Sequence, residues 1–204
     1  MPKEFEDLVS TIQKLPGIGP KAASRIALYI VTENKDLGNQ LISDIHEGLH
    51  SLSICKLCGN ISDLNKICSI CIDSKRDRSK VAMVFSIPDL LAIEKTQSYN
   101  GLYFIFNHAE SIFDQKDKFD EQITKMFNFL NHFNTDKKET IFAFPHTIDS
   151  EIISSLITEK LQENFKNIDI SQIAFGMPSG ADFDYTDKLT IIKSFKGRNS
   201  LLNR

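Results

Sequence analysis

The chain has 204 residues, of which 41% are hydrophobic and 25% charged, and its formal net charge is -3. This length suffices for one large domain or a compact domain with a small appendage, and the weakly acidic balance excludes a global attraction to nucleic acid. No apolar run approaches the roughly 20 residues of a membrane span, and the opening MPKEFEDLVS lacks the layout of a signal peptide, so we expect a cytoplasmic protein without membrane contact.

The first third of the chain shows helical periodicity. Apolar residues recur at spacings of three and four before Gly17, again after Gly19, and a third time from Leu37 to Leu52. We therefore predict two helices joined by a tight turn, and a third helix that runs into the segment containing the cysteines.

The turn between the first two helices has the sequence PGIGP. Gly17 and Gly19 can adopt backbone angles closed to other residues, and Pro20 suits the first turn of a helix. The N–H groups of such a turn favour a phosphate, and Lys21 and Arg25 add cations one helical turn apart. We expect these glycines and cations to bind DNA without sequence preference. The alternative is an ordinary helical hairpin whose glycines only permit close packing.

The four cysteines form two C-x-x-C pairs separated by nine residues. Cys55 pairs with Cys58, and Cys68 pairs with Cys71, so that each pair can present two thiolates to one tetrahedral ion. In a reducing compartment this arrangement indicates one structural zinc ion rather than disulfides. A redox-active dithiol is the alternative, but it needs one reactive pair rather than two in tandem.

After the cysteines, short segments rich in β-branched and aromatic residues alternate with helical patterns. This alternation predicts an α/β fold with a parallel sheet covered by helices. The charged run DSKRDRSK, residues 73–80, indicates a solvated connector. The expected strands are 79–86, 101–107, 139–145 and 168–176. The expected helices are 88–96, 119–133, 149–165 and one after Tyr185.

The hairpin sequence LPGIGPKAASRIA and the tandem cysteine pairs together resemble the RecR family of bacterial recombination mediators. Further segments that are similar to the family are RDRS (76–79), LLAIEKT (90–96), YNGLYFIF (99–106), FGMPSGADFDYTDKLTI (175–191) and KGR (196–198). The resemblance covers nearly the whole chain and implies four regions. These are a helical region with a helix-hairpin-helix (1–53), a four-cysteine zinc knuckle (54–74), a Toprim-like α/β domain (78–176) and a C-terminal segment for oligomerisation (177–204).

Toprim domains in topoisomerases and primases hold magnesium with a glutamate after the first strand and an acidic pair after a later one. Phe85 and Ser86 stand where RecR-family members usually carry acidic residues, whereas Asp149 and Glu151 resemble the later acidic pair. Phosphoryl transfer with metal ions needs several converging carboxylates, so we expect no catalytic residues. The resemblance implies that Asp149 and Glu151 contact the partner RecO. The alternative is that they complement the dipole of a helix N-terminus.

The resemblance implies a non-enzymatic, DNA-binding protein of recombinational repair. It would act with RecO, and in some bacteria RecF, to load recombinase onto single-stranded DNA as a ring-like homotetramer or dimer. Two other classes stay open: a Toprim-type nuclease or primase, and a zinc-ribbon interaction protein that does not touch DNA. The missing carboxylates disfavour the enzyme, and the hairpin cations Lys21 and Arg25 disfavour the interaction protein.

Overall fold

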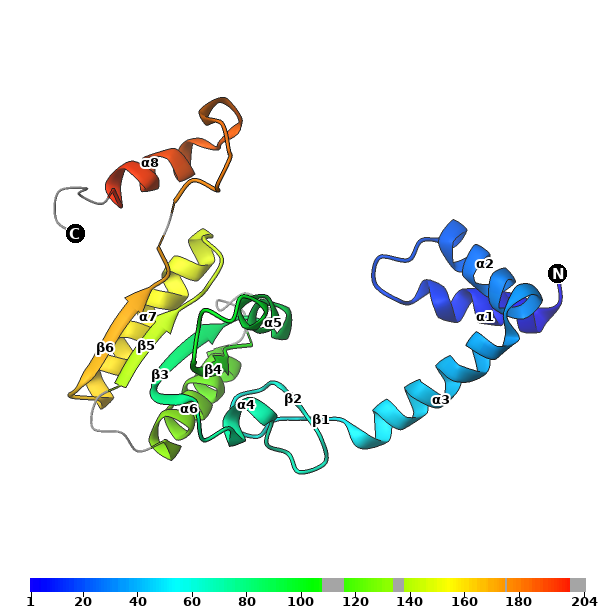
Figure 1. Cartoon of the computed structure of the whole chain (residues 1–204), viewed down its shortest axis with the longest axis horizontal. Helices are drawn as coiled ribbons and strands as arrows, with labels where there is room; N and C mark the ends of the chain where they lie inside the picture. The colour runs from blue at the N-terminus through cyan, green and yellow to red at the C-terminus, as the bar shows by residue number, and fades with distance from the viewer. Residues whose placement is uncertain (108–115, 134–137, 175, 199–204) are drawn as a thin grey trace. The chain divides into compact units, whose positions relative to one another are not determined.

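The computed structural model describes residues 1–107, 116–133, 138–174 and 176–198. The chain divides into two compact units, Met1–Leu52 and Ser53–Arg204 (Figure 1). The cysteine segment belongs to the second unit. Within the described ranges, no helix is both long enough and apolar enough to cross a lipid bilayer.

The first unit is helical, as the periodicity predicted. Helices α1 and α2 form the two arms of the hairpin, and Ala23 and Ala27 of α2 are fully buried. Helix α3 starts after Asn34, whose side-chain oxygen accepts a hydrogen bond of 2.9 Å from the N–H of Leu37. The bounds are α1 Lys3–Gln13, α2 Pro20–Leu28, a π-helical turn Tyr29–Glu33 and α3 Lys35–Ser51.

The second unit contains the predicted parallel sheet. Its strand order is β4-β3-β5-β6, and all three pairings are parallel. Each strand ends two to four residues earlier than the sequence pattern predicted, so the following residues lie in loops at the carboxyl edge of the sheet. The bounds are β3 Asp77–Val84, β4 Gly101–Ile105, β5 Lys138–Phe142 and β6 Ile168–Gln172.

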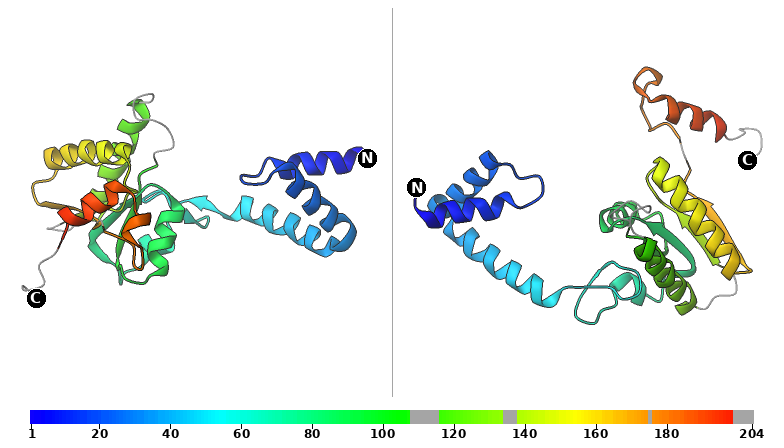
Figure 2. Two further views of the ribbon diagram at one scale, coloured as in Figure 1. Left: turned by 90° about the horizontal axis from the view of Figure 1, so that it is seen from above. Right: turned by 180° about the vertical axis from the view of Figure 1, so that it is seen from behind.

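Helices cover both faces of this sheet (Figure 2). Along β3, Val81 and Met83 join a large core with α6 and α7, whereas Ala82 and Val84 join a smaller core with α5. This alternation is expected because successive residues of a strand point to opposite faces. The bounds are α5 Ile87–Lys95, α6 Lys116–His132, α7 Ile148–Asn164 and α8 Lys188–Lys196.

Besides the π-helical turn, four short elements among the described residues were not predicted from the sequence. Strands β1 and β2 form an antiparallel pair that frames the first cysteine pair, and α4 contains Cys71. A 3-10 turn precedes α8. The bounds are β1 Ser53–Ile54, β2 Ile61–Ser62, α4 Ser69–Ile72 and the 3-10 turn Phe183–Tyr185.

Candidate nucleic-acid interface and metal centre

The turn between α1 and α2 has the predicted backbone geometry at Gly17 but not at Gly19. Gly17 has a φ of +80°, a conformation that disfavours residues with a side chain. Gly19 is the N-cap of α2 with φ -82° and ψ 171°, which any residue can adopt. A Cβ atom at either glycine would meet no atom within 4 Å. Close packing inside the hairpin therefore does not explain either glycine.

Both predicted cations lie on α2, close to this turn. The side chains of Lys21 and Arg25 are exposed and make no hydrogen bond or ion pair with any residue that the structure describes. Helix α2 contains no acidic residue that could neutralise them. The first N–H groups of a helix have no acceptor within the helix, and they point outward at its positive end. The structure thus brings together two unneutralised cations and a helix N-terminus.

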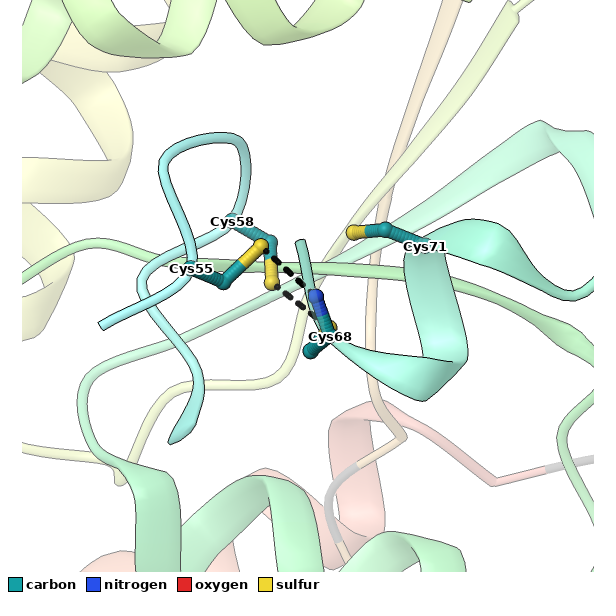
Figure 3. A group of neighbouring side chains, drawn as sticks. All are labelled: Cys55, Cys58, Cys68 and Cys71. Carbon is teal, nitrogen blue, oxygen red and sulfur yellow. Dashed lines mark hydrogen bonds between the residues drawn. The ribbon is translucent and has the colours of Figure 1, made fainter. Parts of the chain in front are cut away.

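The four cysteines come together in a single buried cluster (Figure 3). Their sulfur atoms all lie within 4.8 Å of one another, and the Sγ atoms of Cys58 and Cys68 are 3.5 Å apart. Each of the four side chains is at most 4% exposed. None forms a disulfide. In the described part of the chain this is the one group of three or more potential metal ligands at such distances.

Local backbone geometry positions the two cysteine pairs. The N–H of Gly59 donates to the carbonyl of Cys55 over 3.0 Å, with a φ of +84° at Gly59. A Cβ at Gly59 would lie 3.3 Å from that of Ile105, so a side chain is disfavoured by space as well as by conformation. The N–H of Ile105 donates over 2.8 Å to the carbonyl of Cys58, which fixes the first pair against β4.

The sulfur cluster fits a tetrahedral metal ion. Zn–S bonds of about 2.3 Å place four sulfur ligands about 3.8 Å apart, close to the spacing found here. The backbone N–H of Cys68 also donates to the Cys55 sulfur over 3.3 Å, a contact that stabilises a thiolate ligand. With four soft ligands and a buried position, the cluster suits a closed structural site rather than a catalytic one.

Aromatic side chains occupy the sheet edge at which a Toprim enzyme would need its first acid. Phe85 follows β3 directly and stacks on Phe144, which follows β5; the ring centroids are 4.0 Å apart. Ser86 is the N-cap of α5, and its hydroxyl donates to Asp89 over 2.6 Å. Neither position after β3 therefore supplies a carboxylate ligand for a divalent cation.

The later acidic pair lies in the first turn of α7. Asp149 and Glu151 are both exposed. At this position the two acids can complement the dipole at the N-terminus of α7. Both carboxylates are also accessible to a partner. Asp149 has no hydrogen-bond or ion-pair partner among the described residues, whereas Glu151 accepts a hydrogen bond from Lys193 of α8. This bond and the positive charge of Lys193 lower the pKa of Glu151.

Sequence reasoning did not predict that Lys193 also contacts His146. His146 lies in the loop before α7, and its Nδ1 atom is 3.2 Å from the Lys193 ammonium. Burial lowers the pKa of His146, and the nearby Lys193 charge lowers it further. No local pattern could have revealed this arrangement, because Lys193 is 42 residues from Glu151 and 47 from His146.

Arg76 corrects the interpretation of the charged run as a solvated connector. Its guanidinium donates to both carboxylate oxygens of Glu94, over 2.8 and 2.5 Å, and to the carbonyl of Gly101 over 3.2 Å. The Arg76 side chain is only 15% exposed. Residues from Asp77 onward belong to β3. The run therefore ties the end of the cysteine segment to α5 and β4.

An α/β protein with a helix-hairpin-helix unit and a four-cysteine cluster has the architecture of a class of proteins that act in recombinational DNA repair. A family model described as the RecR helix-hairpin-helix matches residues 5–49, and one for the RecR C-terminal region matches residues 176–199.

Whole-chain relatives agree with these matches. The chain is 33% identical over 201 residues to the recombination protein RecR of Orientia tsutsugamushi strain Boryong, covering 96% of this chain and 95% of that protein. It is 31% identical to the recombination protein RecR of Ligilactobacillus salivarius, covering 98% of each chain. The same protein of Bifidobacterium longum subsp. infantis is 31% identical, with 95% and 94% covered. The chain belongs to the RecR family and is a recombination repair protein.

Proposed function

We propose that this protein is a non-enzymatic mediator that binds DNA through its helix-hairpin-helix and helps to load recombinase onto single-stranded DNA. The observation that carries the proposal is the free positive end of α2, where Lys21 and Arg25 are exposed and no acid of that helix neutralises them. Backbone amides and flexible cations suit phosphates rather than base edges. We therefore expect binding that is electrostatic and independent of sequence.

Gly19 supports this assignment. Its backbone angles do not require glycine, and a Cβ there would meet open space. Serine and aspartate are better N-caps than glycine, so helix formation does not require glycine either. A phosphate that approaches the α2 N–H groups closely does provide a reason, because a side chain at the N-cap would stand in its path.

The DNA contact of one chain is expected to be weak. Two cations on a chain with a net charge of -3 give a small attraction, and several linked hairpins would raise the effective concentration of binding groups. Helix α3 supplies a surface for such association. It has no buried residue, and Ile42, Ile45 and Leu49 are 70%, 60% and 77% exposed. Burying these side chains against further copies would support a homotetramer or dimer that encircles DNA as a ring-like clamp.

The proposal assigns no catalytic residue. Phe85 and Ser86 supply no carboxylate at the carboxyl edge of the sheet, and the later acidic pair, Asp149 and Glu151, lies in the first turn of α7. A Toprim-type nuclease or primase needs more ligands than this pair provides. We assign the pair instead to contact with RecO, and with RecF where that protein occurs. Cys55, Cys58, Cys68 and Cys71 would hold one structural zinc ion.

The test is the solution mass of the full chain, measured by analytical ultracentrifugation with and without a single strand of about 60 nucleotides, long enough for several DNA-binding units to engage at once. A multiple of the 23.1 kDa chain mass, together with a DNA complex, supports the clamp. Substituting Ile45→Asp and Leu49→Asp should lower the mass toward that of one chain and weaken DNA binding in parallel. A monomeric parental protein would contradict the clamp, and parental protein that fails to bind DNA would contradict the mediator.

A further inference from the structure

The acidic pair of α7 is partly occupied by the chain's own C-terminal helix. The ammonium of Lys193 on α8 contacts the Glu151 carboxylate and also lies 3.2 Å from His146 Nδ1. An ammonium only donates hydrogen bonds, so Nδ1 of His146 must accept here and carry no proton. Lys193 is 22% exposed even though α8 lies at the surface. Its charged end is thus held between an acid and a neutral imidazole.

The remainder of α8 is held loosely. No residue of this helix is buried. Three of its apolar residues, Leu189, Ile192 and Phe195, are 52%, 41% and 62% exposed, whereas Ile191 is half-buried. A helix of nine residues is marginal in water without tertiary packing. The contacts of Lys193 therefore help to hold this helix on the domain.

We propose that α8 acts as an autoinhibitory strap: Lys193 covers Glu151 until a partner presents its own cationic side chain to the acidic pair. This inference rests on the proposed function, which assigns Asp149 and Glu151 to partner contact. In this arrangement Lys193 takes the place of the partner's lysine or arginine. Displacing it frees α8, whose apolar side chains can then pack elsewhere in the assembly.

The energetics suit a reversible strap. Glu151 is 54% exposed, and ion pairs with such exposure contribute little net stability. Asp149, one position before the buried Ser150, keeps its carboxylate free and can make the first contact with an approaching cation. Because partner and strap share Glu151, each lowers the apparent affinity of the site for the other.

The test uses full-length protein and two readouts. The first is amide hydrogen exchange of residues 188–196 without any partner, and the second is the affinity for purified RecO of the same organism. The variants are Lys193→Glu, Glu151→Lys and the double exchange, with Lys196→Glu as control. Lys196 makes no hydrogen bond or ion pair within the described ranges, and its substitution changes the net charge equally.

We expect Lys193→Glu to accelerate exchange of α8 and to raise RecO affinity, each by roughly two- to fivefold, the range of an exposed ion pair. Lys196→Glu should change neither. Glu151→Lys should accelerate exchange and abolish most RecO binding, whereas the double exchange should restore slow exchange without restoring RecO binding.

The two ideas fail in different ways. If Lys193→Glu kept the parental rate of amide exchange in α8 and the parental affinity for RecO, the strap would be overturned. The partner site would still stand if Glu151→Lys failed to bind RecO. Parental RecO binding in Glu151→Lys would overturn the partner site, and with it the regulatory role of the strap. Faster exchange of α8 in Lys193→Glu without a rise in RecO affinity would also overturn the autoinhibition.

Discussion

Phe85 and Phe144 stack nearly parallel, with an interplanar angle of 5° and ring centroids 4.0 Å apart, across the carboxyl ends of β3 and β5. Phe142 extends the stack, with its ring 5.4 Å from that of Phe144. In an open parallel sheet this edge is where ligands bind. Here the stack places aromatic side chains beside the ends of β3 and β5, where a metal-dependent enzyme would need a carboxylate.

Removal of the Phe85 ring should lower the free energy of unfolding. Phe85 is half-buried and Phe144 is 1% exposed, so Phe85→Ala removes a stacked partner and leaves a partial cavity. We expect a loss of about 2 kcal/mol in the free energy of unfolding. Urea denaturation of Phe85→Ala and Phe85→Leu measures it. Leucine should retain much of the stability because it keeps most of the apolar volume. Equal stability of Phe85→Ala and the parent would show that the stack contributes little.

The chain should neither cleave nor synthesise nucleic acid with magnesium or manganese. Phe85 and Ser86 do not supply the acid that a Toprim enzyme needs after β3, and Glu151 of the later acidic pair is already engaged by Lys193. Incubation of the protein with supercoiled plasmid or primed template in each metal checks this expectation. Metal-dependent nicking or synthesis that disappears in Asp149→Ala and Glu151→Ala would show that the protein is an enzyme.

One tightly bound zinc ion per chain is expected in protein prepared without chelator. Replacing Cys58 by serine should lower the zinc content and the thermal stability together, because metal-binding energy at a structural site is also folding energy. The N–H of Ile105 on β4 bonds to the Cys58 carbonyl, so the damage should extend into the sheet. Elemental analysis and calorimetry provide the readouts. Well under one zinc ion per parental chain would contradict this assignment.

The ion pair between Arg76 and Glu94 should make the free energy of unfolding decrease as the pH falls. The hydrogen bonds from Arg76 hold the pKa of Glu94 below its ordinary value of 4.5. A lowered pKa in the folded state contributes stability above pH 4.5, and this contribution is lost as the pH falls through the folded-state value. We expect Glu94→Gln to cost about 2 kcal/mol near neutral pH and less in acid, around pH 3. Denaturation at both pH values measures this, and an equal cost at each would count against the ion pair.

Substitutions of the two hairpin glycines should separate folding from binding. Gly17→Ala places a side chain at φ +80° and should destabilise the first unit by about 1 kcal/mol. Gly19→Ser retains a good N-cap, so α2 should form normally while DNA affinity falls. Circular dichroism and fluorescence anisotropy with labelled single strands provide the two measurements. Unchanged DNA affinity in folded Gly19→Ser would mean that no phosphate approaches this end of α2.

Helical and strand periodicity predicted the regular elements well. The helix expected at 149–165 is α7, Ile148–Asn164, and the segment 168–176 contains β6. The pattern overestimated β6 because Ile173 is apolar but 46% exposed, so its hydrophobicity does not mark a buried strand position. Strands of two residues, such as β1, are too short to show any periodicity.

The cysteine spacing predicted a cluster, and the structure confirms that all four sulfur atoms converge. Contacts between distant residues were beyond the reach of the same reasoning. Arg76 looked like part of a solvated run because its partner, Glu94, lies 18 residues away. Lys193 gave no signal because a lysine in a short amphipathic helix is ordinary until the fold places it beside Glu151.

The hairpin's role in DNA binding is tested most directly by the salt dependence of binding in the double variant Lys21→Ala, Arg25→Ala. Both side chains are exposed and make no polar contact within the described structure, so the variant should remain folded and oligomeric. Lys35→Ala, at the start of α3, serves as a control that removes one cation outside the hairpin turn. We expect the double variant to bind all DNA sequences more weakly and the slope of log affinity against log salt to fall by about one for each phosphate that the protein no longer neutralises. A folded, oligomeric double variant that binds DNA with parental affinity and parental salt dependence would contradict the role of the hairpin.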